Sequence, residues 1–295
     1  MDNIVAFELL MVIVYGLCIG SFLNVVIYRV GKTKEKIIGR SCCPKCKNQL
    51  KWYHNIPLFS WIFLKGKCSF CKTPISIQYP LIELSTTIIA IITYLNEGLS
   101  LYSLATFITF TLLLAISTID IKYKMVPDSL SILALIFAYL HTPNIIEALQ
   151  YSLILMGAFY FIRLLGDFVF NKEIMGEGDI LIAGIIGAML PSFQDFMTSI
   201  MITAIVAFIP TIIAKLKMKK REENIFDERF NEIEKISDNL LKKDLDDVVY
   251  QEKVKILNDG IKEFKVKDIA MEGIPFIPYL MAGLFITYFF NVNFY

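Results

Sequence analysis

The chain has 295 residues, 56% of them hydrophobic, and its 29 Lys and Arg against 28 Asp and Glu give a net charge of +1. Soluble globular domains average about 45–50% apolar and about 25% charged residues, whereas only 19% are charged here and the mean hydropathy is +0.58. Residues 215–268 alone contain 14 basic and 14 acidic side chains. This composition excludes an ordinary cytosolic enzyme and a disordered chain, and it predicts a polytopic membrane protein with one charged insertion.

Apolar segments that could form membrane helices recur along the chain, where a span needs about 20 residues. The first segment lacks the basic start and the small-residue cleavage site of a signal peptide, so we expect it to remain as a span. We predict eight spans, at residues 5–28, 80–97, 101–119, 128–142, 147–168, 179–194, 196–214 and 275–292. The predicted fold is an all-α polytopic membrane protein. We divide it into an N-terminal region with two spans and the loop between them (1–97), a transmembrane core (98–214), a charged insertion (215–268) and a C-terminal span (269–295).

The Lys and Arg residues predict the orientation of these spans, because short cytoplasmic loops carry an excess of them. With eight spans all 29 fall on one side, 11 of them in residues 29–79 and 14 in residues 215–268. The opposite loops and both termini contain none. We therefore expect these two segments in the cytoplasm and both termini outside.

The loop at residues 29–79 contains two Cys-x-x-Cys pairs with 21 residues between them. Two such pairs can place four thiolates around one tetrahedral Zn²⁺, and the reducing cytoplasm disfavours disulfides. We therefore predict a structural zinc in a zinc-ribbon-like loop, with the ligands Cys43, Cys46, Cys68 and Cys71. Cys42 is expected to be a bystander, and Cys18 a small buried hydrophobic residue of the first span.

Carboxylates inside or at the ends of apolar spans are candidates for function, because burying them is costly. The candidates are Glu8, Glu83, Asp120 and Asp179. The predicted topology puts Asp120 and Asp179 at the same, cytoplasmic, boundary, where two carboxylates could share a proton and activate water against a peptide carbonyl. Structural alternatives stay open, since Asp179 could cap a helix and Asp120 could be a solvated loop residue.

Neighbouring residues refine this hypothesis. Gly176 and Gly178 would let a substrate backbone approach closely. Asp120 lies near a helix C-terminus and Asp179 near an N-terminus, so the helix dipoles favour Asp179 as the ionised base and Asp120 as the proton holder. Asp128 directly follows Pro127, and we interpret it as the N-cap of the fourth span.

These segments resemble a known family. Gly176-Glu177-Gly178-Asp179 matches the Gly-x-Gly-Asp motif of intramembrane aspartic proteases, and residues 120–128 resemble the other aspartate segment of the prepilin peptidases, the type IV leader peptidases. Further matches to that family occur in the same order along the chain: Gly20 to Arg29, the two cysteine pairs, Trp52 to Trp61, Tyr79-Pro80 to Glu83, and Ile274 to Pro278.

The resemblance implies a bacterial inner-membrane enzyme that cuts the short basic leader of type IV prepilins and secretion pseudopilins on the cytoplasmic side. It implies Asp120 and Asp179 as the catalytic pair and the four cysteines as the zinc-type cluster. Many members then methylate the new N-terminus with S-adenosylmethionine. Candidates for that step in the 1–97 region are Asn24, Arg29 and Glu83, which could equally be helix-packing residues. His54 is expected to form hydrogen bonds within the loop.

The sequence also departs from the family, with Lys122, Leu181 and Gln78 at positions where other residue types are common. A peptidase that lacks methylation is therefore a second hypothesis. A membrane transporter or scaffold with a zinc ribbon is a third, although transporters usually show internal repeats and midplane charges. The labelled product of a prepilin incubated with S-adenosylmethionine would separate all three.

The insertion at residues 215–268 begins with five basic residues, which predict contact with anionic membrane lipid. Apolar residues then recur at roughly helical spacing, which indicates one or two amphipathic helices. The balanced charge argues against nucleic acid as a partner. We interpret the insertion as a surface extension, with docking to pilus or secretion assembly proteins as the alternative.

Overall fold

The computed structural model describes residues 2–33, 41–170 except 44, 176–206 except 191, 193 and 204, residue 220, and 277–290. The chain divides into two compact units, Met1–Ala204 with Pro275–Tyr295, and Ile205–Ile274. The amphipathic helices expected in the insertion lie outside the described residues. Within the described part the secondary structure is helical, and pairing of extended backbone is limited to two isolated bridges, Cys42 with Gln49 and Lys67 with Pro74.

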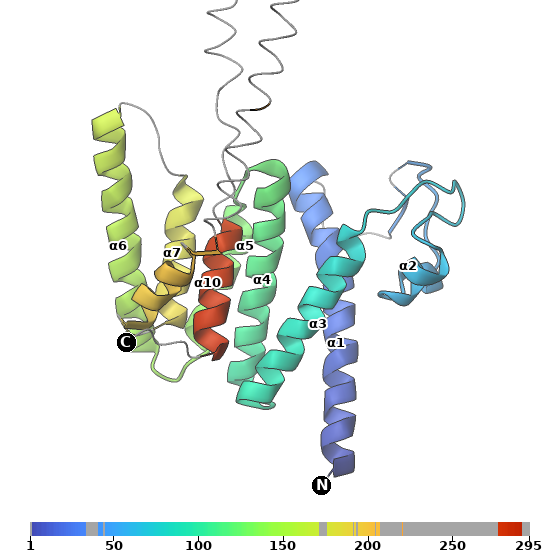
Figure 1. The fold of residues 1–295 in the computed structure, drawn as a ribbon, viewed down its shortest axis with the longest axis horizontal. Helices are drawn as coiled ribbons and strands as arrows, with labels where there is room; N and C mark the ends of the chain where they lie inside the picture. The colour runs from blue at the N-terminus through green and yellow to red at the C-terminus, as the bar shows by residue number, and fades with distance from the viewer. Residues whose placement is uncertain are drawn as a thin grey trace, which may run out of the picture. The chain divides into compact units, whose positions relative to one another are not determined.

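The first unit is built from helices (Figure 1). The helices are α1 (Asp2–Tyr28), a π-helical turn η1 (Arg29–Thr33), a 3₁₀ turn η2 (Trp52–Asn55), α2 (Phe59–Phe63), α3 (Gln78–Glu97), α4 (Leu101–Tyr123), α5 (Asp128–Leu140), α6 (Ile145–Phe170), α7 (Glu177–Met189) and α10 (Ile277–Phe290). Residues 194–203 are also helical. The loop that contains the two cysteine pairs (the cysteine loop), with its short helix α2, lies between α1 and α3 in the chain.

A helix therefore lies at each predicted span, but the helices differ in length. Four segments of the described chain are long and apolar enough to cross a membrane: Ile4–Gly31, Gln78–Glu97, Leu101–Tyr123 and Ile145–Val169. The helices α5 and α7 have 13 residues each and α10 has 14, which is about 20 Å of helix against a hydrocarbon core of about 30 Å. The structure thus supports a membrane protein with four candidate spans.

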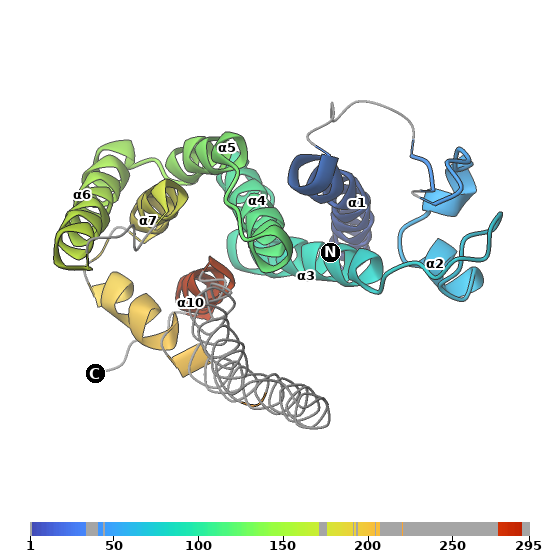
Figure 2. The same cartoon turned by 90° about the horizontal axis from the view of Figure 1, so that it is seen from above.

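The helix α4 lies at the centre of this unit, in contact with α1, α3, α5 and α10 (Figure 2). Its Phe110 is fully buried and packs edge to face against Phe285 of α10, with ring centroids 5.4 Å apart. Phe289 of α10 lies 5.0 Å from the same ring. Aromatic packing of this kind adds to the energy of burial, so α10 is held against α4 although it lies far away in the sequence.

A tight hairpin orients α3 against α4. Gly98 has φ +68°, a conformation that is unfavourable for other residues, and its amide donates to Tyr94 O at 2.9 Å. Ser100 then caps α4, because its hydroxyl accepts from the Ser103 amide at 2.9 Å while the Ser103 hydroxyl accepts from the Ser100 amide at 3.0 Å. The start of α4 is therefore fixed, and its far end carries Asp120.

The helices α1 and α3 pack closely through two glycines of α1. A methyl group at Gly16 would lie 2.8 Å from Thr87 Cα, and one at Gly20 would lie 2.7 Å from Glu83 Cα. Small residues four apart let membrane helices approach to backbone contact. Cys18 lies on the exposed side of α1, so the prediction of a buried Cys18 was wrong. Glu8 of α1 accepts a hydrogen bond from the Tyr94 hydroxyl at 2.8 Å.

Candidate functional site

Asp120 is a buried carboxylate in the last turn of α4. Its side chain is 8% exposed, and its backbone carbonyl accepts from the Lys124 amide at 3.0 Å. Lys124 has φ 52°, and this left-handed residue ends the helix. The predicted third span ended at residue 119, whereas α4 continues to Tyr123. Asp120 is therefore a helical residue of the core, and the alternative of a solvated loop residue is wrong.

Asp179 is the third residue of α7. Gly176 precedes the helix as its N-cap residue, and the Gly176 amide donates to Asp179 Oδ2 at 3.2 Å. Asp179 is therefore not the N-cap, which was the structural alternative, although its carboxylate does accept a hydrogen bond at the helix start. The side chain is partly buried. A peptide N–H that donates to a carboxylate stabilises its charged form.

The two aspartate segments lie against each other. A methyl group at Gly178 would lie 2.5 Å from Val126 Cβ, in the turn between α4 and α5. The carboxylates of Asp120 and Asp179 interact electrostatically. Gly178 was predicted to let a substrate backbone approach. In the structure the chain's own Val126 occupies the space beside the Gly178 Cα. Gly178 is needed to bring α7 close to the end of α4.

Replacing Gly178 by Ala is expected to push the two aspartate segments apart. The added methyl clashes with backbone-fixed Val126, so we expect a loss of about 1–3 kcal/mol in stability and a loss of about 10²-fold in any activity of the pair, as for displacements of about 1 Å. Thermal unfolding and turnover would be measured together. Gly157→Ala in α6 is the control, because a methyl group there would meet nothing within 4 Å. Equal losses in both variants would contradict this account.

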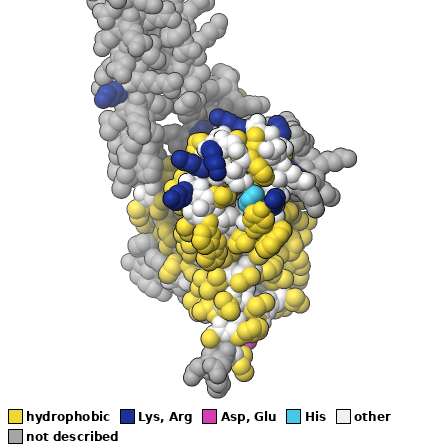
Figure 3. Space-filling model, turned by 90° about the vertical axis from the view of Figure 1, so that its right-hand side faces the viewer, with side chains coloured by type: hydrophobic (Ala, Val, Ile, Leu, Met, Phe, Trp, Pro, Cys, Tyr) yellow, Lys and Arg dark blue, Asp and Glu magenta, His cyan; other side chains and the backbone are white. Residues whose placement is uncertain are grey.

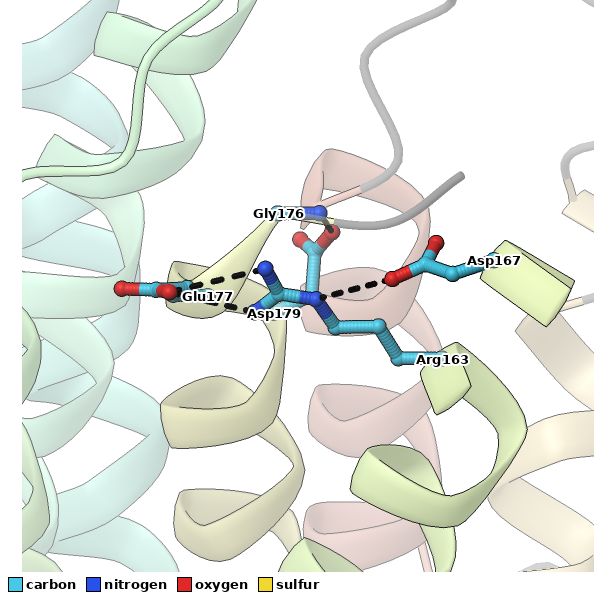
Figure 4. A network of polar contacts seen from close by, with 5 residues as sticks. All are labelled: Arg163, Asp167, Gly176, Glu177 and Asp179. Carbon is cyan, nitrogen blue, oxygen red and sulfur yellow. Dashed lines mark hydrogen bonds and ion pairs between the residues drawn. The ribbon is translucent and has the colours of Figure 1, made fainter. Parts of the chain in front are cut away.

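A charged network fastens α6 to the start of α7, beside Asp179 (Figure 4). Arg163 lies 3.7 Å from Asp167 Oδ2 and 3.4 Å from Glu177 Oε1, and the Arg163 side chain is only 15% exposed. The charge count placed Arg163 among the cytoplasmic Lys and Arg residues, and no site role was predicted for it. It lies within the predicted span 147–168, so the rule that selected the acidic residues would also have selected Arg163.

Asp128 occupies the first turn of α5, and its N-cap position is taken by Pro127. The prediction that Asp128 is the N-cap was wrong by one residue. Asp128 is exposed, and its charge at a helix N-terminus is favourable. The polar contact at this end comes instead from Ser131, whose hydroxyl donates to Pro127 O at 3.2 Å.

The four predicted cysteines form one cluster. Their Sγ atoms all lie within 4.8 Å of one another, and Cys43 Sγ and Cys71 Sγ are 3.8 Å apart. Zn–S bonds of about 2.3 Å in a tetrahedron put sulfur atoms about 3.8 Å apart, so this donor set fits zinc. Cys42 is exposed and lies outside the cluster, as expected of a bystander.

The two halves of the cluster have the same backbone design. The Cys43 amide donates to Asn48 O at 3.0 Å and the Cys68 amide donates to Thr73 O at 2.9 Å. Lys47 and Lys72, one residue after each pair, have φ 59° and 56°. Repeated tight turns of this kind turn the thiols of each pair inward, so the chain itself preorganises four sulfur ligands.

The thiols also differ in acidity. Hydrogen bonding with the Thr73 side chain and backbone lowers the pKa of Cys71 to about 6. The Asn48 amide acts in the same direction on Cys46, but burial and the neighbouring thiols Cys43 and Cys71 outweigh it and raise the pKa of Cys46 to about 11. Neighbouring thiolates repel one another, which makes it harder to ionise all four thiols. A bound cation would offset this repulsion and stabilise the four thiolates.

Two of the three residues proposed for methyl transfer meet where the cysteine loop joins α3. Glu83 is 7% exposed and accepts from the Leu58 amide at 2.8 Å. Asn24 is 4% exposed and donates to Tyr79 O at 3.0 Å and to Gly20 O at 3.2 Å, while its Oδ1 has no hydrogen-bond partner among the described residues. Arg29 begins η1, the turn that follows α1. The packing role considered for Asn24 and Glu83 is thus present.

His54 is held mainly by ring contacts. Its ring centroid lies 4.5 Å from that of Tyr53 and 5.6 Å from that of Phe70. The expected side-chain hydrogen bond is not seen at Nδ1, which has no partner in the described part of the chain.

Two family models match the chain. The model of the bacterial peptidase A24 N-terminal domain matches residues 14–96, and that of the type IV leader peptidase family matches residues 107–214. The first covers α1 from Val14 onward, the cysteine loop and α3 up to Asn96, and the second covers both aspartate segments. The chain belongs to the type IV leader peptidase family.

Curated relatives agree with these matches. The chain is 35% identical over 184 residues to a prepilin leader peptidase/N-methyltransferase of Myxococcus xanthus, covering 60% of this chain and 54% of that protein. It is 32% identical over 251 residues to a protein of the same name from Stutzerimonas stutzeri, covering 75% and 85%. It is 34% identical over 197 residues to a type 4 prepilin-like proteins leader peptide-processing enzyme of Escherichia coli, covering 59% and 73%. No solved structure matches the chain.

Proposed function

We propose that this protein is a membrane aspartic endopeptidase that removes the leader peptide of type IV prepilins or pseudopilins and then methylates the new N-terminus. The observation that carries the peptidase activity is the approach of the two aspartate segments, with Gly178 against Val126. The Asp120 and Asp179 carboxylates are near enough to repel each other electrostatically. The names of the relatives support the substrate class and both activities.

The chemistry follows from two carboxylates that share one proton. The ionised carboxylate takes a proton from water as the water oxygen bonds to the scissile carbonyl carbon. The protonated carboxylate gives its proton to the carbonyl oxygen, which leaves a tetrahedral gem-diol. As the C–N bond breaks, the carboxyl group that took the water proton passes it to the amide nitrogen, and the other carboxylate takes a proton from a hydroxyl of the diol. The products are an amine and a carboxylic acid, and the pair returns to its starting protonation. We assign the base to Asp179, because the Gly176 amide and the start of α7 favour its charge, and the acid to Asp120. The two titrate as a coupled pair.

For methylation we propose a site at the junction of α1, α3 and the cysteine loop. S-adenosylmethionine would supply the methyl group as an electrophilic sulfonium carbon. The buried Asn24 Oδ1, for which the described residues provide no hydrogen-bond partner, and the Glu83 carboxylate are suited to polar groups of such a ligand. Arg29, at the end of α1, is proposed as a further contact.

Variants at this junction are expected to separate the two activities. Asn24→Ala and Glu83→Gln should lower methyl incorporation by about 10-fold and leave cleavage within about two-fold, as for loss of one hydrogen bond to a charged group. Labelled methyl transfer and leader release would be measured on the same prepilin sample. Asn96→Ala is the matched control, since Asn96 donates to Ile92 O four residues back, as Asn24 donates to Gly20 O. Equal loss of both activities would refute a separate methylation site.

We also propose that the four cysteines bind a structural Zn²⁺. Four thiolates complete a tetrahedral coordination sphere, so the metal would fold the loop and take no part in bond cleavage. Its effect on function would be indirect, because the Leu58–Glu83 hydrogen bond ties the loop to α3.

The topology we propose has eight crossings of the bacterial inner membrane, with both termini outside and the aspartates at the cytoplasmic boundary. The one-sided distribution of Lys and Arg supports it. Short helices such as α5 and α7 can cross part of the bilayer when they are buried in protein, and most of α7 is buried.

One assay tests this function. Purified protein in lipid is incubated with a prepilin and labelled S-adenosylmethionine, and the products are resolved by mass. Leader release with label on the mature N-terminus supports both activities. Leader release without label would leave the peptidase alone. No release would remove the proposed function and favour a membrane scaffold.

A further inference from the structure

The cysteine loop has an unusually basic surface. Six lysines lie between residues 41 and 77, and that segment contains no Asp or Glu. All six are exposed: Lys45, Lys47, Lys51, Lys65, Lys67 and Lys72. In the view onto this end of the molecule, Lys and Arg side chains gather directly above a band of hydrophobic side chains (Figure 3).

The same loop exposes large apolar side chains. Trp52 and Phe63 are each 80% exposed, Ile62 is 62% exposed and Phe59 is 55% exposed. They belong to η2 and α2, which lie outside the predicted spans. Exposed apolar clusters of this kind mark a surface that contacts a membrane or another protein.

The loop is held at the end of two candidate spans. The Leu58 amide, next to Phe59, donates to Glu83 of α3, and Asn24 of α1 donates to Tyr79 O at the start of α3. Gln78–Glu97 and Ile4–Gly31 are both candidate membrane spans. The exposed face is therefore fastened to the helices that would cross the bilayer, close to the membrane surface.

We propose that this loop face, formed by Trp52, Phe59, Ile62 and Phe63 with the six lysines, docks onto the anionic headgroup surface of the bilayer that α1 and α3 cross. Aromatic side chains settle at the headgroup level, and each Lys near an anionic membrane strengthens binding by about five-fold. A second copy of the loop would be repelled by like charge, and so would a basic peptide. An anionic lipid bilayer matches both parts of the face, because its headgroups attract the lysines and its interfacial region accommodates the apolar side chains.

Fluorescence can test this directly, because the chain has only two Trp residues, Trp52 and Trp61. Trp61 is part of the loop interior, with its Nε1 donating to Ile75 O at 3.4 Å. The full-length Trp61→Phe variant reports on Trp52 alone, and Trp52→Phe reports on Trp61. Each would be placed in nanodiscs of phosphatidylcholine with or without phosphatidylglycerol, using lipids brominated near the headgroup as quenchers.

We expect Trp52 to be quenched more strongly in the anionic nanodiscs, and Trp61 to respond little to lipid charge. Replacing Lys51, Lys65, Lys67 and Lys72 by Gln should lower docking by about five-fold per Lys and shift Trp52 emission to the red. Lys122→Gln with Lys124→Gln is the matched control, since both are exposed lysines outside the loop, and should leave quenching unchanged. Unchanged emission from Trp61 would show that the substituted loop is folded.

Three results would overturn the proposal. The first is quenching of Trp52 that is equal in neutral and anionic nanodiscs or unaffected by the four Gln substitutions. The second is shielding of Trp52 from aqueous iodide by a synthetic prepilin leader in detergent, which would assign the face to the substrate. The third is shielding that grows with protein concentration, which would assign it to a second copy. None of these readouts depends on cleavage.

Discussion

Asp120→Asn and Asp179→Asn are each expected to lower leader cleavage by about 10³-fold or more, because an amide can neither accept the proton of water nor donate an acidic proton in its place. Both substitutions keep the side-chain shape, so the packing around the buried Asp120 should survive. Initial rates would be measured with a purified prepilin at several pH values, together with thermal unfolding.

The matched control for these variants is Asp195→Asn. Asp195 lies beyond the other end of α7, so its loss removes one acidic residue without touching the pair. We expect near wild-type cleavage for it. A pH–rate profile that keeps its shape in either Asp120→Asn or Asp179→Asn would speak against a catalytic pair.

Cys43→Ser and Cys68→Ser are expected to abolish metal binding and to unfold the cysteine loop. The two residues are buried and come from different halves of the cluster, and a structural Zn²⁺ contributes about 10 kcal/mol or more to the folding of small metal domains. Wild-type protein should contain about one Zn²⁺ per chain, measured by elemental analysis, and proteolysis should cut the loop only in the variants or after chelation.

Cys42→Ser provides the control, because Cys42 is the exposed neighbour of Cys43 outside the cluster. It should keep its zinc and its resistance to proteolysis. Methylation should fall in the Cys43 and Cys68 variants, since the loop holds Leu58 against Glu83. Full zinc content in Cys43→Ser would show that the cluster is not the metal site.

Much of the fold could be predicted because membrane helices have simple sequence signals. The predicted span 80–97 agrees with both ends of α3 to within two residues, and the predicted span 101–119 begins where α4 begins. Gly98 and Ser100 form the turn between them. The end of α7 was placed too late. Leu190 has left the helical region, with φ −122° and ψ 78°, as expected for a residue before a proline, whereas hydropathy continues across it.

Two features could not be predicted from the sequence: which side of a helix faces the protein core, and which distant residues come into contact. Cys18 lies in an apolar helix whose lipid-facing and core-facing residues have the same composition, so hydropathy could not tell that it is exposed. The approach of Val126 to Gly178 joins residues 52 positions apart, and no local pattern encodes it. The cysteine cluster was predictable because its ligands must keep a fixed spacing and chemistry whatever surrounds them.

The most direct test of the account compares the residual cleavage of Asp120→Asn, Asp179→Asn and the double variant in single-turnover reactions, with leader release followed by mass spectrometry. Residues that act as one unit are strongly non-additive, so we expect each single variant to be as slow as the double variant. Additive losses, or measurable cleavage retained in either single variant while the double is inactive, would contradict a shared catalytic site.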